Sequence, residues 1–145
     1  MFLAQKLNKN LEAIDAADEE AKKLNRDIFE TIYYAAIYES NQLCMNGKYK
    51  PYDFFEGSPM SQGRFQFDMW NVDETKLSGM WDWNKLKENV KSHGVCNSLF
   101  TAQMPVASSA KITGSYEMTE PAHSAIFNRR VVGGEIMIVN KYLIS

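Results

Sequence analysis

Residues 18–45 read DEEAKKLNRDIFETIYYAAIYESNQLCM and predict one long helix. The acidic start suits the positive end of a helix dipole, and Asp15 or Asp18 can cap it. Apolar side chains recur at helical spacing along one face, and Gly47 is the expected stop. The members of this predicted apolar stripe are Leu24, Ile28, Ile32, Ala35 and Ala36. At 1.5 Å per residue the helix would be about 40 Å long, so we expect it to pack against more protein than the 145 residues supply.

The stretch after this helix, residues 48–80, is predicted to be a structured loop and not a linker. It carries prolines and glycines among many aromatic residues, whose side chains require burial. Those expected to be buried are Phe54, Phe55, Phe65, Phe67 and Trp70. A second helix is expected from Asp82 to His93, with Asp82 as its cap and Gly94 as its end.

The remaining third of the chain predicts strands and one brief helix. A short apolar strand is expected at Leu99–Met104, and the brief helix that follows should end at Gly114. Two apolar runs, residues 126–132 and 135–139, flank Gly133-Gly134, which is the signal of a two-residue hairpin turn. The expected fold class is therefore α/β, with a long helix, a short parallel strand and a β-hairpin.

The composition indicates a soluble, cytoplasmic protein. Hydrophobic residues make up 45% of the sequence and charged residues 23%, which argues against a disordered chain. The net charge of −2 provides no basic excess that would attract nucleic acid or a membrane surface. The sequence has no run of about 18 apolar residues and no secretory signal at its start.

The common catalytic and nucleotide-binding motifs are absent, including the P-loop, GxGxxG, HExxH and CxxC. Residue types and spacing thus predict no metal site. His93 and His123 lack ligand-spaced neighbours, so we expect structural or surface roles for both. Cys44 and Cys96 are interpreted as inert free thiols, because neither has a neighbouring cation or helix start that would activate it.

One segment, residues 99–110 (LFTAQMPVASSA), combines the features of an anion site. A predicted strand leads into a turn, and the turn opens a helix. Ala107, Ser108 and Ser109 are small enough to let an anion reach the free N–H groups at the helix start, and the two hydroxyls add donors. The pattern alone leaves a plain turn with a serine cap as the alternative.

Several further motifs occur in a fixed order along the chain. The first are LNRDIFETIYY at residues 24–34, EGSPMSQG at 56–63, DMWN at 68–71 and WDW at 81–83. They are followed by MP with its ASS loop at 104–109, EP at 120–121, and RRV, GE and IVN between residues 129 and 140. In this order and spacing the motifs resemble the large, catalytic subunit of eukaryote-type and viral class I ribonucleotide reductases. The resemblance runs from about residue 20 to residue 144 without large gaps.

The resemblance implies a fold and a function. The family reduces ribonucleoside diphosphates to deoxyribonucleotides, the precursors for DNA replication, by thiyl-radical chemistry in a ten-stranded α/β barrel. Residues 1–145 would then form a single, incomplete segment of that barrel domain. The segment would hold the substrate diphosphate through backbone amides and hydroxyls of one loop. The loop residues implied are Pro105, Val106, Ala107, Ser108 and Ser109.

The resemblance also implies partners. They are the remaining segments of the large subunit, the small subunit and the ribonucleoside diphosphate, with no nucleic acid or membrane among them. No cofactor is expected on this segment, whereas the intact family enzyme uses the small subunit's radical and a thiol reductant.

The chain also departs from the family pattern. Val106 and Ser109 replace threonines of the usual Met-Pro-Thr-Ala-Ser-Thr loop, which removes one hydroxyl and leaves the backbone donors. Cys96 stands where the family usually has arginine. Nothing resembles the segments that carry the radical cysteine, its redox partner or the C-terminal thiol pair, so we expect the chain to be inactive by itself. The alternatives are a catalytically inactive remnant that binds another protein, and an unrelated small phosphate-binding fold.

Overall fold

The computed structural model of the chain describes residues 19–117, 119 and 124–139. The predicted caps Asp15 and Asp18, and also His123, lie outside the described residues. The chain divides into two compact units. We call Lys22–Ala102 the helical unit, and the described residues from Gln103 onward the C-terminal unit.

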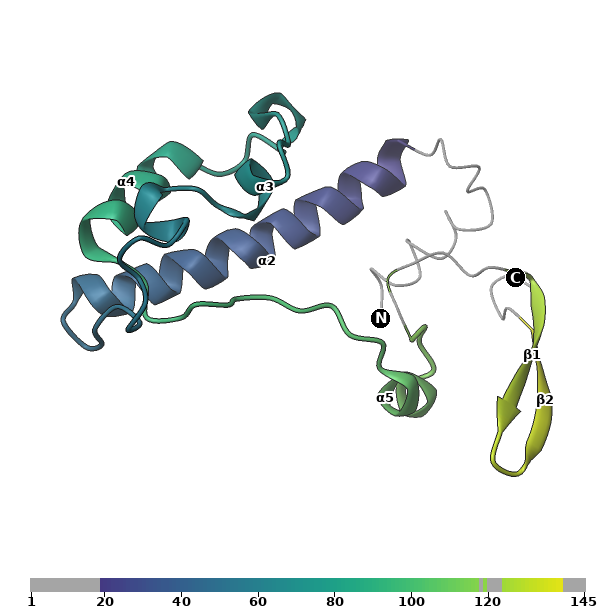
Figure 1. Ribbon diagram of the computed structural model, residues 1–145. Coiled ribbons are helices and arrows are strands. Elements are labelled where there is room, and N and C mark those ends of the chain that lie inside the picture. The colour runs from purple at the N-terminus through teal and green to yellow at the C-terminus, as the bar shows by residue number, and fades with distance from the viewer. Residues whose placement is uncertain (1–18, 118, 120–123, 140–145) are drawn as a thin grey trace. The chain divides into compact units, whose positions relative to one another are not determined.

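The long helix predicted from the sequence is α2, Glu19–Met45 (Figure 1). Its end is built as expected around Gly47, which has a φ of 66°. The Gly47 N–H donates to the Cys44 carbonyl at 3.0 Å, and the Lys48 N–H donates to the Leu43 carbonyl at 3.0 Å. A positive φ at the end of a helix favours glycine, which has no Cβ.

The buried face of α2 is not the predicted apolar stripe. Ile32, a member of that stripe, is 47% exposed, whereas Ile37 is fully buried. The buried positions next to Ile37 on this face are polar: Glu30, Ser40 and Asn41. Hydrogen bonds with the facing segments compensate for the burial of Glu30, Ser40 and the Asn41 Nδ2 group, whereas the buried Asn41 Oδ1 has no partner within the described residues. A search for apolar periodicity does not detect such positions.

The structured loop holds three short helices: η1 (Met60–Gln62), α3 (Gln66–Met69) and η2 (Glu74–Lys76). The burial predicted for its aromatic residues is confirmed for some of them and wrong for others. Phe55, Phe65 and Phe67 belong to the core. Phe54 is 84% exposed and Trp70 is 70% exposed, so the prediction was wrong for these two. Both lie in turns.

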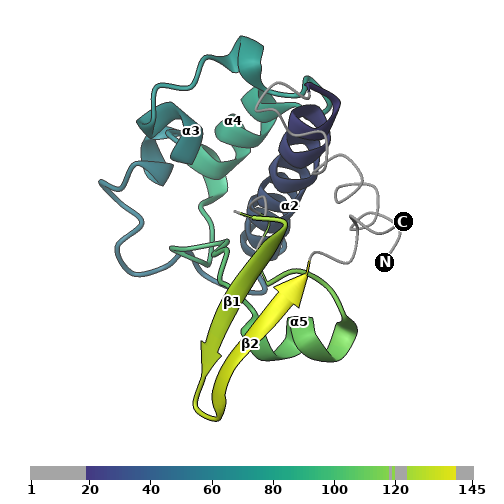
Figure 2. The ribbon, with the colours of Figure 1, turned by 90° about the vertical axis from the view of Figure 1, so that its right-hand side faces the viewer.

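The second helix, α4 (Trp83–His93), begins and ends where the sequence predicted. The Asp82 side chain accepts a hydrogen bond from the Lys85 N–H at 2.9 Å, and Gly94 ends the helix with a φ of 75°. Trp83, Leu86 and Val90 share a core with Ile37 of α2. Figures 1 and 2 show α4 lying alongside α2.

The C-terminal unit contains α5 (Ala107–Thr113) and an antiparallel hairpin of β1 (Ile126–Val131) and β2 (Gly134–Val139) (Figure 2). The brief helix ends at Gly114, as predicted. The hairpin turn is shifted by one residue from Gly133-Gly134 to Val132-Gly133. Gly134 instead opens β2, paired with Val131 and with a φ of 134°.

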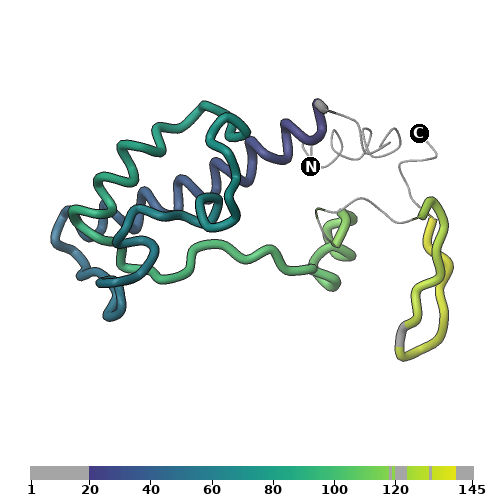
Figure 3. The backbone as a smooth tube through the Cα atoms, turned by 45° about the horizontal axis from the view of Figure 1, so that its top comes forward, coloured from purple at the N-terminus to yellow at the C-terminus, as the bar shows by residue number. Residues whose placement is uncertain are grey.

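The parallel strand predicted at Leu99–Met104 is not formed. These residues run in an extended path (Figure 3) but pair with no strand among the described residues. An extended segment becomes a strand only when a neighbouring strand supplies hydrogen bonds. The two-stranded hairpin is the one sheet in the described ranges, so a ten-stranded barrel is not seen within this chain.

Candidate functional site

The sequence-predicted phosphate loop, Pro105–Ser109, lies at the start of α5. The Val106 N–H donates to the Glu117 carbonyl at 2.9 Å, and the Val106 carbonyl accepts from the Ala110 N–H at 2.9 Å. Within the part of the chain that the structure describes, the backbone N–H groups of Ala107, Ser108 and Ser109 have no acceptor. These are the free donors that the first turn of a helix presents to solvent or to an anion.

The side chains around these donors leave them accessible. Residues 105–109 are all exposed, whereas Ala110 is only 2% exposed and anchors the helix. The Thr113 hydroxyl donates to the Ser109 carbonyl at 3.0 Å, which stabilises the far end of α5. Across the described residues, neither the Ser108 nor the Ser109 hydroxyl has a hydrogen-bond partner. Serine caps of a helix would use these hydroxyls internally, so the plain-cap alternative does not describe this loop.

The acidic side chain of Glu117, whose backbone contacts the loop, is paired with a cation. The Glu117 carboxylate forms an ion pair with Arg129 of β1, which offsets its negative charge. Lys111, in the last turn of α5, is exposed and adds a cation at longer range. Sequence reasoning missed the contacts that Glu117 makes with Val106 and Arg129, because no motif connects these residues with the loop at 105–109.

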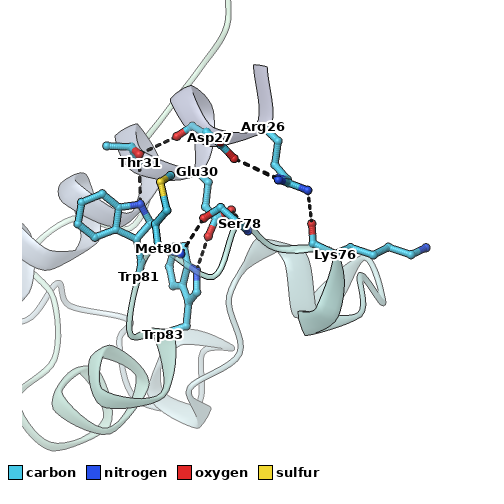
Figure 4. Close-up of polar contacts among 9 residues, drawn as sticks. All are labelled: Arg26, Asp27, Glu30, Thr31, Lys76, Ser78, Met80, Trp81 and Trp83. Atoms are coloured by element: carbon cyan, nitrogen blue, oxygen red, sulfur yellow. Dashed lines mark hydrogen bonds and ion pairs between the residues drawn. The ribbon is translucent and has the colours of Figure 1, made fainter. Parts of the chain in front are cut away.

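A second polar cluster lies in the helical unit, between α2 and the segment that precedes α4 (Figure 4). Glu30 accepts hydrogen bonds at both carboxylate oxygens: 2.9 Å from the Trp83 indole N–H and 2.7 Å from the Ser78 N–H. Thr31 donates to the Asp27 carbonyl at 2.6 Å and accepts from the Trp81 indole N–H at 3.1 Å. These groups are committed to holding two tryptophans, so the cluster is structural.

The two cysteines, which are far apart in sequence, come together in the helical unit. Cys96 Sγ lies 3.3 Å from the hydroxyl of Ser40, and Cys44 is one helical turn beyond Ser40 on α2. The two cysteines are 52 positions apart in the sequence (96 minus 44), and no local motif connects them. Sequence analysis therefore treated them as separate, inert thiols.

Residues 9–145 match the model of the ribonucleotide reductase barrel domain. The chain belongs to this family. The sequence resemblance is thus confirmed, and the described helices and hairpin are a piece of an α/β barrel domain.

Individual relatives support the assignment to the ribonucleotide reductase family. The ribonucleoside-diphosphate reductase large subunit of Acanthamoeba polyphaga mimivirus is 50% identical over 127 residues, covering 88% of this chain. The large chain of Cryptosporidium parvum is 49% identical over 127 residues, covering 88% of this chain. The large subunit of Trypanosoma brucei brucei is 47% identical over 140 residues, covering 89%. The match spans only 14%, 15% and 16% of these three relatives, respectively.

The described part of this ribonucleotide reductase segment offers neither a metal site nor a membrane span. It contains no group of three or more His, Cys, Asp or Glu side chains placed to hold a metal ion. None of its helices is long and apolar enough to cross a membrane. His93 Nδ1 lies 3.3 Å from the Asn89 carbonyl in the last turns of α4, which agrees with a structural role.

Proposed function

We propose that this chain is part of a ribonucleoside-diphosphate reductase large subunit and supplies its substrate diphosphate-binding loop, Pro105–Ser109. The observation that carries the proposal is the exposed start of α5, where three consecutive backbone N–H groups have no acceptor within the described ranges. Family membership supports the same role, because the relatives are ribonucleoside-diphosphate reductase large subunits.

The loop binds through donors that a diphosphate can use together. The N–H groups of Ala107, Ser108 and Ser109 and the two serine hydroxyls all donate, and phosphate oxygens only accept. Each hydrogen bond to a charged partner contributes about 1.5–3 kcal/mol. The loop's role is to bind and orient the substrate, while the small subunit's radical and a thiol reductant supply the reduction in the assembled enzyme.

The proposal is tested in a chimeric enzyme. The 127-residue matching segment of the mimivirus large subunit is replaced by the corresponding part of this chain, and reductase activity and substrate affinity are measured. We expect the chimera to be active with the small subunit and a thiol reductant, and the isolated chain to be inactive. In the chimera, Ser108→Ala should weaken diphosphate binding by roughly ten- to a hundred-fold.

The matched control is Ser92→Ala. Ser92 is exposed on α4, and its hydroxyl donates only to the Glu88 carbonyl of its own helix at 2.9 Å. We expect this control to leave the substrate affinity unchanged. If Ser108→Ala and Ala107→Asp both kept full diphosphate affinity, the loop assignment would be wrong.

The competing function is a catalytically inactive remnant that binds another protein. It uses the same exposed apolar side chains in another way, because Leu99 and Ile112, each 87% exposed, offer contact area to a separate partner protein as well as to further barrel segments. A chimera that folds and binds the small subunit, yet shows neither activity nor diphosphate binding, would select this alternative.

A further inference from the structure

The turn after α4 is hydrogen-bonded to the side chain of Ser40 on α2. The Ser40 hydroxyl accepts hydrogen bonds from the Cys96 N–H at 3.1 Å and from the Asn97 N–H at 3.2 Å. Asn41 adds another hydrogen bond between α2 and this turn, since its Nδ2 donates to the Gly94 carbonyl at 2.8 Å. The backbone of Cys96 is therefore held in one place relative to α2.

The same contacts bring the Cys96 thiol to the face of α2 that carries Cys44. Cys96 Sγ is 3.3 Å from the Ser40 hydroxyl. Side chains four residues apart on a helix are neighbours, with Cβ atoms about 5–6 Å apart, so Cys44 adjoins the Ser40 position that Cys96 contacts. Both cysteines are partly exposed, so a small reagent can reach them.

The electrostatics of Cys44 agree with its thiol lying near that of Cys96. Burial raises the pKa of Cys44, and the charge of Cys96 and a side-chain hydrogen bond with Cys96 raise the pKa further.

We propose that Cys44 and Cys96 form a reversible oxidation site, in which a small-molecule disulfide such as oxidised glutathione converts them into an intrachain disulfide. One thiol loses its proton, and its thiolate attacks a glutathione sulfur, forming a mixed disulfide and releasing one glutathione thiolate. The second cysteine's thiolate then attacks the protein sulfur of the mixed disulfide and displaces the other glutathione. Two thiols and one oxidised glutathione thus become one protein disulfide and two reduced glutathiones.

The consequence of the bridge is local to the helical unit. It would join the last turn of α2 covalently to the turn after α4, and so close the loop between residues 44 and 96. A cross-link of this kind restricts the unfolded chain more than the folded one, because the folded chain already holds the two residues together.

The test uses the dilute full chain and a glutathione redox buffer. Intact mass and peptide mapping should show a species lighter by two hydrogens, with one disulfide-linked peptide pair containing Cys44 and Cys96. Dithiothreitol should restore both thiols. The equilibrium constant for forming the Cys44–Cys96 disulfide should be at least roughly tenfold larger in the native chain than in denaturant, because the fold holds the thiols in proximity.

The control variants are Cys44→Ser and Cys96→Ser, each checked for native helix content. Each should stop at a glutathione mixed disulfide on its remaining cysteine, because the resolving thiol is missing. The proposal is overturned if the native chain keeps two free thiols, or ends with a separate glutathione on each cysteine. It is also overturned if pairing is no more favourable in the native chain than in denaturant.

Discussion

Glu30 illustrates how a single residue holds two segments together. It is 9% exposed, and its two carboxylate oxygens accept from the Trp83 indole and the Ser78 backbone. A buried carboxylate is tolerated when both oxygens have donors. The hydrogen bonds of Glu30 therefore stabilise the junction between α2 and α4.

Glu30→Gln should destabilise the chain by about 1–3 kcal/mol. Glutamine keeps one acceptor oxygen and turns an NH₂ group toward the other donor, which leaves that donor unsatisfied. Denaturant titration measures the change in the free energy of unfolding. Glu39→Gln, at an exposed position on the same helix, is the control and should change stability by less than about 0.5 kcal/mol. Equal effects of the two substitutions would contradict the role assigned to Glu30.

Lys87 is the second residue whose charge stabilises the helical unit. Its ammonium lies 2.8 Å from Asp68 Oδ1, 3.2 Å from Glu74 Oε1 and 5.0 Å from the centre of the Phe67 ring. Burial lowers the pKa of Lys87, but the hydrogen bonds and charges of Asp68 and Glu74 outweigh it, so the pKa is raised above 10.5. Lys87 is therefore more strongly protonated in the folded chain than in the unfolded chain.

The raised pKa of Lys87 predicts that the stability of the folded chain depends on pH. A raised lysine pKa contributes stability that is fully present below the unfolded value of 10.5 and is lost as the pH rises through the folded value. Lys87→Met should lower the melting temperature at neutral pH, and the gap between the two proteins should narrow above about pH 10. The tyrosines Tyr33 and Tyr34, whose pKa values are also raised, are present in both proteins and cancel in the difference. A difference in melting temperature between the two proteins that stays constant up to alkaline pH would contradict the stabilising role assigned to the Lys87 charge.

Among the helices and strands, the sequence predicted those features that depend on neighbouring residues. Asp82, Gly94 and Gly114 are local signals, and each lies at a helix boundary in the structure. The strand at Leu99–Met104 was predicted wrongly because a strand depends on a pairing partner that is distant in sequence. The binding role of the loop Pro105–Ser109 stays a prediction from its small residues and the family resemblance. The Glu117 contact with Val106 comes from a separate segment and could not be predicted.

Gly94→Ala tests the end of α4. Gly94 has a φ of 75° and a ψ of −174°, a conformation essentially restricted to glycine. A Cβ there would lie 2.5 Å from Cγ of Pro51, a ring that cannot move aside easily. Gly47 has a similar φ of 66° but open space around it. We expect Gly47→Ala to cost about 1 kcal/mol in the free energy of unfolding, and Gly94→Ala about 3 kcal/mol or more. Denaturant titration of both variants compares them, and equal costs would mean that the Pro51 contact is relaxed in solution.

At the scale of the whole molecule, apolar side chains are exposed in both units. Phe54 and Leu99 in the helical unit are 84% and 87% exposed, and Ile112 in the C-terminal unit is 87% exposed. The matched part of the large-subunit relatives is 14–16% of their length. We infer that these side chains pack against other segments of a complete barrel, because large exposed apolar groups normally mark contact surfaces.

The isolated chain should therefore self-associate, and the association should depend on these side chains. Sedimentation of the wild-type chain is expected to show concentration-dependent oligomers and binding of a hydrophobic dye. Leu99→Lys combined with Ile112→Lys should weaken both the self-association and the dye binding. The melting temperature should not change, because neither side chain is buried within the chain. In the chimeric large subunit the same pair of substitutions should instead lower the yield of folded, active enzyme, because lysine would then be placed in an apolar interface. A monomeric wild-type chain that excludes the dye, together with a chimera that tolerates both lysines, would show that these side chains face solvent in the assembled enzyme as well.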